Sequence, residues 1–211
     1  MTSRRIVQML WSIAKALLPG MASPSLLALA DRYEKELTDR AFRYTFQEKG
    51  KSPFTARLEF DRSAFCHLFS IGSIVKGYTP DLDEFSGMKG WRNIQEGKIT
   101  LKMLRRINPD QMQYYANEYA MIEELIETVN DPSAVRFDAR KVAGSKLKSD
   151  ILLYRVYGNR TIHVGICQDE DGTWFARSFF VRENDPDKYP SKYIHKMTPL
   201  KVKVKVSSKN A

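Results

Sequence analysis

The side chains best suited to chemistry in this chain are its histidines and cysteines, and none of them has a metal-binding spacing. His67, His163 and His195 stand far apart, and the sequence contains no CxxC or HExxH pair. Cys66 and Cys167 each follow an apolar residue, which is typical of small buried side chains in a reducing compartment rather than of a disulfide. The glycine patterns of nucleotide-binding loops are also missing from the sequence. We therefore expect no metal site and no cofactor.

Two of the histidines are candidates for a site. His67 could act as a general acid or base, because imidazole titrates close to neutral pH. The alternative is a histidine near a helix end that hydrogen-bonds to the backbone. His163 is the second candidate, for contact with a substrate, and it lies on the strand face opposite Ile162 and Val164.

Arg177 and Ser178 lie in a segment with the alternation of a β-strand. Arg177 stands between Phe175 and Phe179, so a strand would place a charge and two aromatic rings on one face. The guanidinium would then bind phosphate while the rings stack on bases. The alternative is an arginine whose stem covers the core. Ser178 faces the other way and could donate to a phosphate, although serines in strands are usually structural.

Basic residues are numerous throughout the chain and concentrated near its C-terminus. The sequence has 34 Lys and Arg against 25 Asp and Glu, a net charge of +9 that suits a polyanion or an anionic membrane surface. Lys201, Lys203 and Lys205 alternate with valines, and each lysine that binds a phosphate would release counterions. The same alternation also protects an exposed edge strand from aggregation, so both interpretations stay open. Arg92 and Lys98 are two further candidates for substrate contacts.

Helical spacing of apolar residues dominates the first two thirds of the chain. Ser23 followed by Pro24 predicts a helix start. An alternation of Phe and Tyr predicts a β-hairpin, and Pro109 divides a later helical region. The segments are an amphipathic helix at 4–18, a second helix at 23–39, a hairpin at 42–60, a short helix at 62–70, a loop at 71–83, and helical spacing at 100–129.

The last third is rich in β-strand patterns. Strands are expected at 151–156, 161–168, 173–181 and 200–206, with tight turns that join the first three into an antiparallel meander. A hydrophobic content of 43% is enough to build a core for such a chain. We predict an α+β fold in which a helical N-terminal part packs on a C-terminal antiparallel β-sheet. The expected division is an amphipathic extension at 1–22, one domain at 23–206 and a tail at 207–211.

Several of these segments together resemble a known nuclease family. They are Ala41 to Phe46 with Arg57 to Phe60, Phe65-Cys66-His67-Leu68 with Gly72, Gly97 to Thr100, Leu152-Leu153-Tyr154, and Val164-Gly165-Ile166 with Ser178-Phe179-Phe180. The chain is similar over about residues 26–206 to the fourth, phage-associated type of the nucleases named after barnase, EndoU, colicins and RelE. The resemblance implies a nuclease-like α+β domain and a catalytic role for His67 with Arg177 and Ser178. It also implies a toxin-like, metal-independent RNA endonuclease that uses the 2′-hydroxyl as nucleophile.

Three functions remain open from the sequence. The first is this ribonuclease, which acts in the cytoplasm on RNA and has an immunity or antitoxin protein as a further partner. The second is an inactive module of the same fold that binds RNA or a host protein. The third, a peripheral membrane protein, would use the amphipathic segment 4–18 and is the least favoured. A transmembrane span is excluded for that segment by its length, and polar residues interrupt it in a way that argues against a signal peptide.

Overall fold

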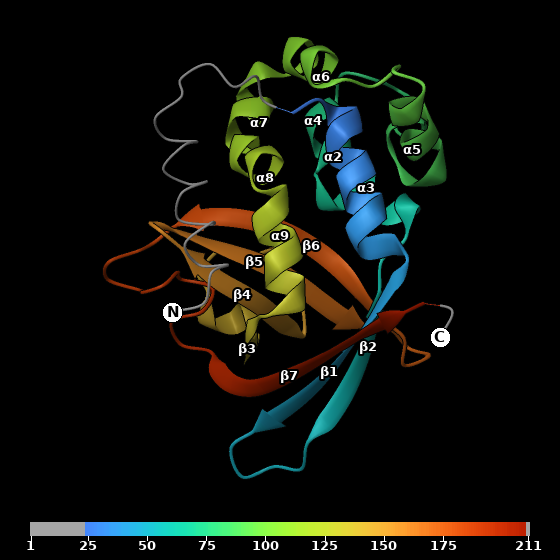
Figure 1. Ribbon diagram of the computed structural model, residues 1–211. Helices are drawn as coiled ribbons and strands as arrows, with labels where there is room; N and C mark the ends of the chain where they lie inside the picture. The colour runs from blue at the N-terminus through green and yellow to red at the C-terminus, as the bar shows by residue number, and fades with distance from the viewer. Residues whose placement is uncertain (1–23, 210–211) are drawn as a thin grey trace.

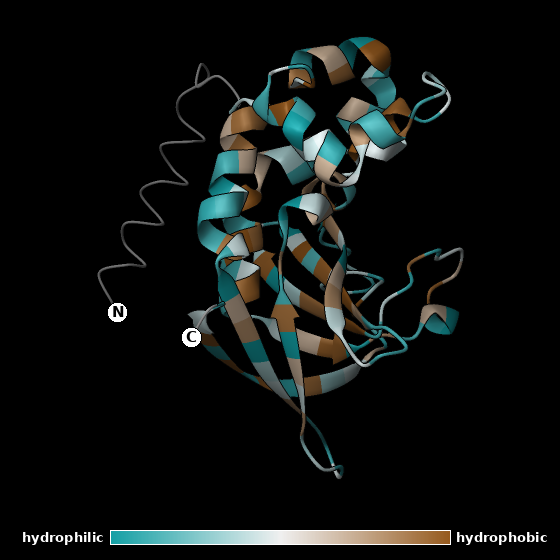
Figure 2. Cartoon of the chain, turned by 90° about the vertical axis from the view of Figure 1, so that its right-hand side faces the viewer, coloured by the Kyte–Doolittle hydropathy of each residue, from teal (hydrophilic) through white to brown (hydrophobic). Residues whose placement is uncertain are grey.

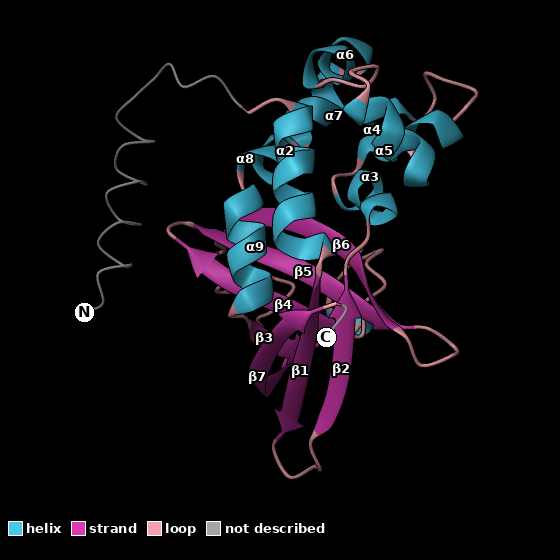
Figure 3. Ribbon diagram, turned by 45° about the vertical axis from the view of Figure 1, so that its right-hand side comes forward, coloured by secondary structure: helices cyan, strands magenta, loops and turns pink. Residues whose placement is uncertain are grey.

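A layer of short helices covers one side of a closed seven-stranded barrel in the computed structural model, which describes residues 24–209 (Figure 1; Figure 3). The helices together with the strands of the barrel confirm the predicted α+β fold. The predicted amphipathic extension at 1–22 lies outside the described residues. The sheet, however, is a barrel that includes the hairpin of the first half of the chain, whereas the sequence had predicted a C-terminal sheet alone.

The helical layer is made of short segments with local caps. Ser25 caps the first of them, because its side chain accepts a hydrogen bond from the Ala28 amide at 3.1 Å. The expected cap at Ser23 is therefore wrong by two residues. Across residues 24–209, every helix is too short or too polar to span a lipid bilayer. The helices and helical turns are α2 (Leu26–Tyr33), η1 (Glu34–Thr38), η2 (Arg62–Ala64), α3 (Phe65–Leu68), α4 (Ile71–Val75), η3 (Asp83–Phe85), α5 (Gly87–Gln95), α6 (Leu101–Ile107), α7 (Pro109–Tyr114), α8 (Ala116–Ala120), α9 (Ile122–Asn130) and η4 (Ala139–Lys141).

The helical region predicted at 100–129 is broken more often than the sequence indicated. Pro109 begins α7, and the Asn108 side chain caps that helix by accepting from the Gln111 amide. Two more breaks follow, because the backbone leaves helical geometry at Tyr115 and at Met121. The segment 71–83 was expected to be a loop, yet its first five residues form α4.

The barrel has the strand order β1-β2-β6-β5-β4-β3-β7. Its ladders are antiparallel except the one between β2 and β6, which is parallel and consists of the single bridge between Leu58 and Trp174. The predicted hairpin and meander are confirmed as β1–β2 and β4–β5–β6. The strands are β1 (Arg40–Glu48), β2 (Phe54–Glu59), β3 (Ser133–Arg136), β4 (Ile151–Tyr157), β5 (Arg160–Gln168), β6 (Trp174–Glu183) and β7 (Thr198–Ser208).

Strand β7 closes the barrel between β1 and β3. It pairs with β1 along nine positions, from Arg40 opposite Ser208 to Glu48 opposite Leu200, and its first residues pair with β3. Within residues 24–209 the side of β7 away from β1 has a ladder only at Thr198–Leu200, so its lysines lie on an edge without a second partner and also suit protection of an edge strand. The strand β3 was not predicted, because four residues are too few for a visible alternation.

The main core lies between the helical layer and the inner face of the barrel. Hydrophobic and hydrophilic residues alternate along the strands in Figure 2, as expected for strands with one buried face. Ile162, Val164 and Ile166 belong to this core, as predicted. A second, smaller cluster lies on the other face of β4–β6 and includes Leu152, Phe180 and Met197.

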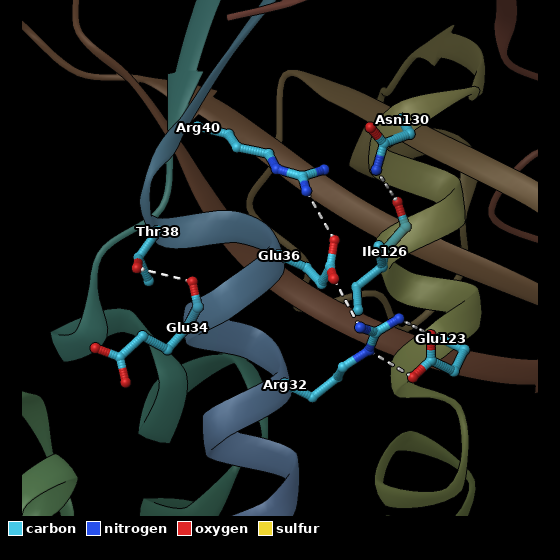
Figure 4. A network of polar contacts seen from close by, with 8 residues as sticks. All are labelled: Arg32, Glu34, Glu36, Thr38, Arg40, Glu123, Ile126 and Asn130. Atoms are coloured by element: carbon cyan, nitrogen blue, oxygen red, sulfur yellow. Dashed lines mark hydrogen bonds and ion pairs between the residues drawn. The ribbon is translucent and has the colours of Figure 1, made fainter. Parts of the chain in front are cut away.

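Charged residues tie α2 to α9 at the surface of the helical layer (Figure 4). Arg32 donates to both carboxylate oxygens of Glu123 at 2.8 Å and to Glu36 at 2.6 Å. Arg40 at the start of β1 donates to the second oxygen of Glu36 at 2.9 Å. These contacts connect α2 with α9, which is far away in the sequence, and connect the end of the same helical segment with strand β1.

Candidate active site

The imidazole of His67 is exposed because the residues around it are anchored inward. Asp61 caps the turn before α3 by accepting from the Ala64 amide at 3.1 Å. Phe65, Cys66 and Leu68 are then buried in the core, which leaves His67 as the one residue of α3 that faces solvent.

The strand β6 holds the ring of His67 through a main-chain group. Ala176 pairs with Ile166 and Ser178 pairs with Gly165, so Arg177 is an extra residue without a partner on β5. Such a β-bulge releases backbone groups from the ladder. His67 Nε2 donates to the freed carbonyl of Arg177 at 2.7 Å.

This hydrogen bond determines which ring nitrogen of His67 is available for chemistry. A carbonyl oxygen can only accept, so Nε2 must carry the hydrogen. In the neutral ring the lone pair is therefore on Nδ1, for which no hydrogen-bond partner is found among residues 24–209. Nδ1 of His67 is thus free to accept a proton from a bound molecule.

His67 borders two hollows. The first has a volume of about 300 Å³, opens where β2 and β6 diverge beyond their single bridge, and combines carboxylates, apolar side chains and Arg177. Its lining residues are Glu59, Phe60, Asp61, Ala64, His67, Phe175, Ala176 and Arg177.

The second hollow, of about 330 Å³, lies on the other side of His67 and contains hydroxyls and a cation but no carboxylate. Ser70 in its wall has a φ of +56°, a left-handed conformation that is uncommon for residues other than glycine. Burial raises the pKa of the neighbouring Cys66 thiol to about 12, so this thiol stays protonated at neutral pH. The residues that line the second hollow are Cys66, His67, Ser70, Gly72, Ser73, Lys76, Leu82, Phe85 and Ser86.

Comparison with family models gives one match, which covers residues 25–210 of the chain. The matching family is described as phage-Barnase-EndoU-ColicinE5/D-RelE like nuclease4. The chain belongs to this nuclease family. The curated proteins and the solved structures that were compared contain no match.

The structure brings two of the predicted catalytic residues, His67 and Arg177, together in the first hollow. Arg177 is exposed and forms no ion pair with any carboxylate in residues 24–209. The expected shared face of Arg177 with two phenylalanines is wrong. Phe175 pairs with Cys167 and Phe179 with Val164, and the bulge between them puts the two rings on opposite faces.

The hydroxyl of Ser178 does not line either hollow beside His67. Its Oγ is buried and has no hydrogen-bond partner within the described chain. It lies against Gly165, close to where a Cβ of that residue would be. A direct contact of Ser178 with a substrate phosphate is not available in this conformation.

His163 is an interior residue, so it cannot contact a substrate as the sequence had suggested. The ring is fully buried, stacks on Phe180 at 4.4 Å between centroids, and donates from Nδ1 to the Phe180 carbonyl at 3.3 Å. Its Nε2 therefore accepts from the Ser191 hydroxyl at 2.8 Å. Burial lowers the pKa of His163 to about 3.

The remaining predicted residues are exposed but lie outside both hollows. Arg92 is on the surface of α5, and Lys98 forms an ion pair with Glu96 at 2.6 Å. The lysines Lys201, Lys203 and Lys205 are exposed on the outer face of β7.

Sequence reasoning missed the polar residues that lie near His67 in the second hollow. Ser73 comes from α4, which had been expected to be a loop, Lys76 directly follows α4, and Ser86 precedes α5. Asp61, which caps the turn before α3 and lines the first hollow, was not among the predicted site residues. Within residues 24–209, no group of three or more His, Cys, Asp or Glu side chains is arranged to hold a metal ion.

Both cysteines of the nuclease-family chain are free thiols buried in the structure, as the sequence predicted.

Proposed function

We propose that the chain is a ribonuclease that cleaves RNA at His67, by attack of a 2′-hydroxyl on the adjacent phosphate and without a metal cofactor. The observation that carries the proposal is the imidazole of His67, exposed between two hollows and held through Nε2 so that Nδ1 is free. Membership of a nuclease family supports cleavage of a phosphodiester. A free imidazole nitrogen that can accept the proton of a hydroxyl supports RNA as the substrate, since only RNA has the 2′-hydroxyl.

In the proposed reaction, Nδ1 of His67 takes the proton of the 2′-hydroxyl. The 2′ oxygen forms a bond to phosphorus, and the bond from phosphorus to the 5′ oxygen breaks. The leaving 5′ oxygen receives a proton from the ammonium of Lys76, which lines the second hollow. The products are a 2′,3′-cyclic phosphate and a 5′-hydroxyl, and solvent returns the proton from His67 to Lys76.

Cations and hydroxyls around His67 suit the charge that develops on phosphorus. Arg177 on one side and Lys76 on the other carry full positive charges. Ser73 and Ser86 add hydroxyl donors to the second hollow. Donors held in place before the reaction stabilise a charged transition state more than mobile water does.

A second candidate function is a binding module that does not cleave RNA. The observation in its favour is that His163 is buried, so His67 is the only histidine that borders either hollow among residues 24–209. In this case the same surface would bind RNA or a host protein. The description of the family names phages, and with either function we propose a toxin-like role in the cytoplasm with an immunity or antitoxin protein that covers His67.

The test is to incubate the purified protein with transfer RNA and total RNA in EDTA and to map the new termini. We expect ends with a 2′,3′-cyclic phosphate and a 5′-hydroxyl, and no cleavage of DNA of the same sequence. Cleavage that requires added Mg²⁺ and leaves a 5′-phosphate would contradict the proposal. Binding of RNA without any cleavage would assign the chain to the binding module.

A further inference from the structure

Strands β7, β1 and β2 present a row of cations on the outer face of the barrel. Val202, Val204 and Val206 of β7 alternate with the lysines and pair with Phe46, Tyr44 and Phe42 of β1. The lysines therefore share the outward side with Arg43 of β1 and Arg57 of β2. We call Arg43, Arg57, Lys201, Lys203 and Lys205 the basic track.

Like charges lie directly opposite one another within the basic track. Arg43 pairs in register with Lys205 on one side and with Arg57 on the other. Cations placed in this way across two ladders repel each other and destabilise the sheet. Arg57 is neutralised by Glu59 at 2.7 Å, whereas Arg43 and the three lysines form no ion pair with any carboxylate in residues 24–209.

The basic track leads to the first hollow at His67. Beyond the end of β7, Lys209 donates from Nζ to the Phe60 carbonyl at 3.1 Å and lies 3.5 Å from the Glu59 carboxylate. Glu59 and Phe60 are both part of the wall of that hollow. The end of β7 and the end of β2 thus converge on the rim of the candidate active site.

The outward positions of this face suit an RNA strand better than a membrane or an apolar partner. Between the cations they carry Thr45 and Thr55, whose hydroxyls can donate to phosphate and sugar oxygens, and Gln47, whose amide donates to the main-chain carbonyls of Glu48 and Lys51. None of these outward positions on β1, β2 and β7 carries a large apolar side chain that could insert into a bilayer.

We propose that the basic track binds the backbone of a single RNA strand and leads it over the Lys209 rim to His67. This inference rests on the proposed function, because it assigns to the same site an extended substrate of several nucleotides. The cations of the basic track that form no ion pair within residues 24–209 then have a physical role, since phosphates of the strand offset the repulsion between Arg43 and its neighbours.

The first test measures the salt dependence of RNA binding. The probe is a fluorescent 2′-O-methyl oligonucleotide of about twelve nucleotides, which lacks the nucleophile and stays intact, titrated at about 50 to 200 mM KCl. The variant is Arg43→Gln/Lys203→Gln/Lys205→Gln. The matched control, Lys102→Gln/Arg105→Gln/Arg106→Gln, removes the same charge from exposed positions of α6, which lies in the helical layer on the opposite side of the molecule from the β1–β2 hairpin (Figure 1).

We expect the track variant to lower the slope of log affinity against log salt by about 2, since each lost phosphate contact removes about 0.7. The control should keep the wild-type slope. Thermal unfolding of the track variant should occur at the wild-type temperature or above it, because Arg43→Gln removes like-charge repulsion. An unchanged slope in the track variant, or an equal fall of the slope in the control, would overturn the inference. A track variant that binds anionic vesicles less well but binds the RNA probe as wild type does would overturn it too.

The second test asks whether RNA on the basic track reaches His67. Diethyl pyrocarbonate modifies exposed imidazoles, and His195 is an exposed histidine outside the hollows that serves as an internal comparison. Mass spectrometry should show that the bound probe protects His67 but not His195, and that protection falls in the track variant. Undiminished modification of His67 at saturating probe would refute the path to the site. Because the probe cannot be cleaved, both tests give a result even if the ribonuclease proposal fails.

Discussion

At the scale of single residues, the proposed reaction depends on one imidazole whose two nitrogens have different roles. Nε2 of His67 is occupied by the Arg177 carbonyl, so any proton transfer must use Nδ1. The side chain is exposed and contributes little to the core. Replacing it should therefore affect chemistry far more than stability.

We predict that His67→Ala lowers the rate of RNA cleavage in EDTA by about 10² to 10⁴, the usual effect of losing a positioned acid or base. Thermal stability and RNA affinity should stay close to wild type. Single-turnover cleavage assays and thermal melts measure these effects. His195→Ala is the matched control, because His195 is also exposed but lies outside both hollows. Equal cleavage by His67→Ala and wild type would show that the assignment of His67 is wrong.

Arg177 can be tested without disturbing the anchor of His67. Arg177→Ala keeps the main-chain carbonyl that binds Nε2 and removes only the guanidinium. We expect cleavage to fall by about 10²-fold, as for the loss of one transition-state donor, and RNA affinity to fall as well. Arg177→Lys should retain part of both, because the positive charge remains. If Arg177→Ala lowers neither rate nor affinity, the guanidinium does not act on the phosphate.

His163 makes stability depend on pH. Burial lowers its pKa in the folded state to about 3, whereas an unfolded histidine titrates near 6.5. The unfolded chain therefore binds a proton that the folded chain does not bind, and the contribution to stability that is present above pH 6.5 is lost as the pH falls towards 3. Between these two pKa values, the free energy of unfolding is expected to fall by about 1.4 kcal/mol for each pH unit by which the pH is lowered.

Urea unfolding between pH 7.5 and pH 5 measures this slope. The side chain in His163→Gln is polar but cannot titrate, so the difference in unfolding free energy between wild type and this variant should change with pH. In His195→Ala the wild-type slope should persist. A constant difference between wild type and His163→Gln would mean that His163 is not the residue responsible.

At the scale of elements, α3 is placed by its contact with α5. A Cβ at Gly90 of α5 would lie 2.8 Å from Cys66 Sγ and 2.7 Å from the main-chain carbon of Phe85. Only a glycine allows the two helices to approach this closely, and His67 follows Cys66 directly. The position of the imidazole therefore depends on a residue in another helix.

Gly90→Ala should destabilise the protein by about 1 to 3 kcal/mol, because the added methyl group forces α5 away from α3. The control is Gly72→Ala in α4, where no atom lies within 4 Å of the added Cβ and φ is not positive. That variant should be as stable as wild type or more stable, since alanine favours a helix by about 1 kcal/mol over glycine. Denaturant titrations give both values, and a Gly90→Ala variant of wild-type stability would contradict the packing argument.

At the scale of the whole molecule, the barrel is closed by a strand from the far end of the chain. Strand β7 is paired with β1 along the whole length of β1 and also contacts β3. Without it, both strands would expose unpaired backbone groups, which invite aggregation. The opposite seam, between β2 and β6, has only one bridge, and the first hollow opens there.

Deletion of residues 198–211 should therefore abolish cooperative unfolding and produce aggregates. A control that lacks only residues 210–211 should behave as wild type. Circular dichroism melts and size-exclusion chromatography follow the two outcomes. A truncated chain that stays monomeric and melts cooperatively would show that β7 is not required to close the barrel.

Local patterns in the sequence were sufficient for the α+β class, the β1–β2 hairpin, the β4–β6 meander, the buried thiols and the nuclease family. Alternation of apolar residues, turn residues and proline act through neighbouring backbone atoms, so each can be recognised within a few residues. His67 and Arg177 were predicted as site residues in the same way, through short motifs that resemble a family, and their roles stay a prediction.

The tertiary structure decided what joins these pieces. Closure by β7 depends on pairing between Arg40 and Ser208, at opposite ends of the chain. One unpaired residue at Arg177 shifts the strand register, which separates Phe175 from Phe179 and turns a carbonyl towards His67. Local periodicity cannot reveal a bulge or a distant partner, because both are set by the packing of strands and helices that are far apart in the sequence.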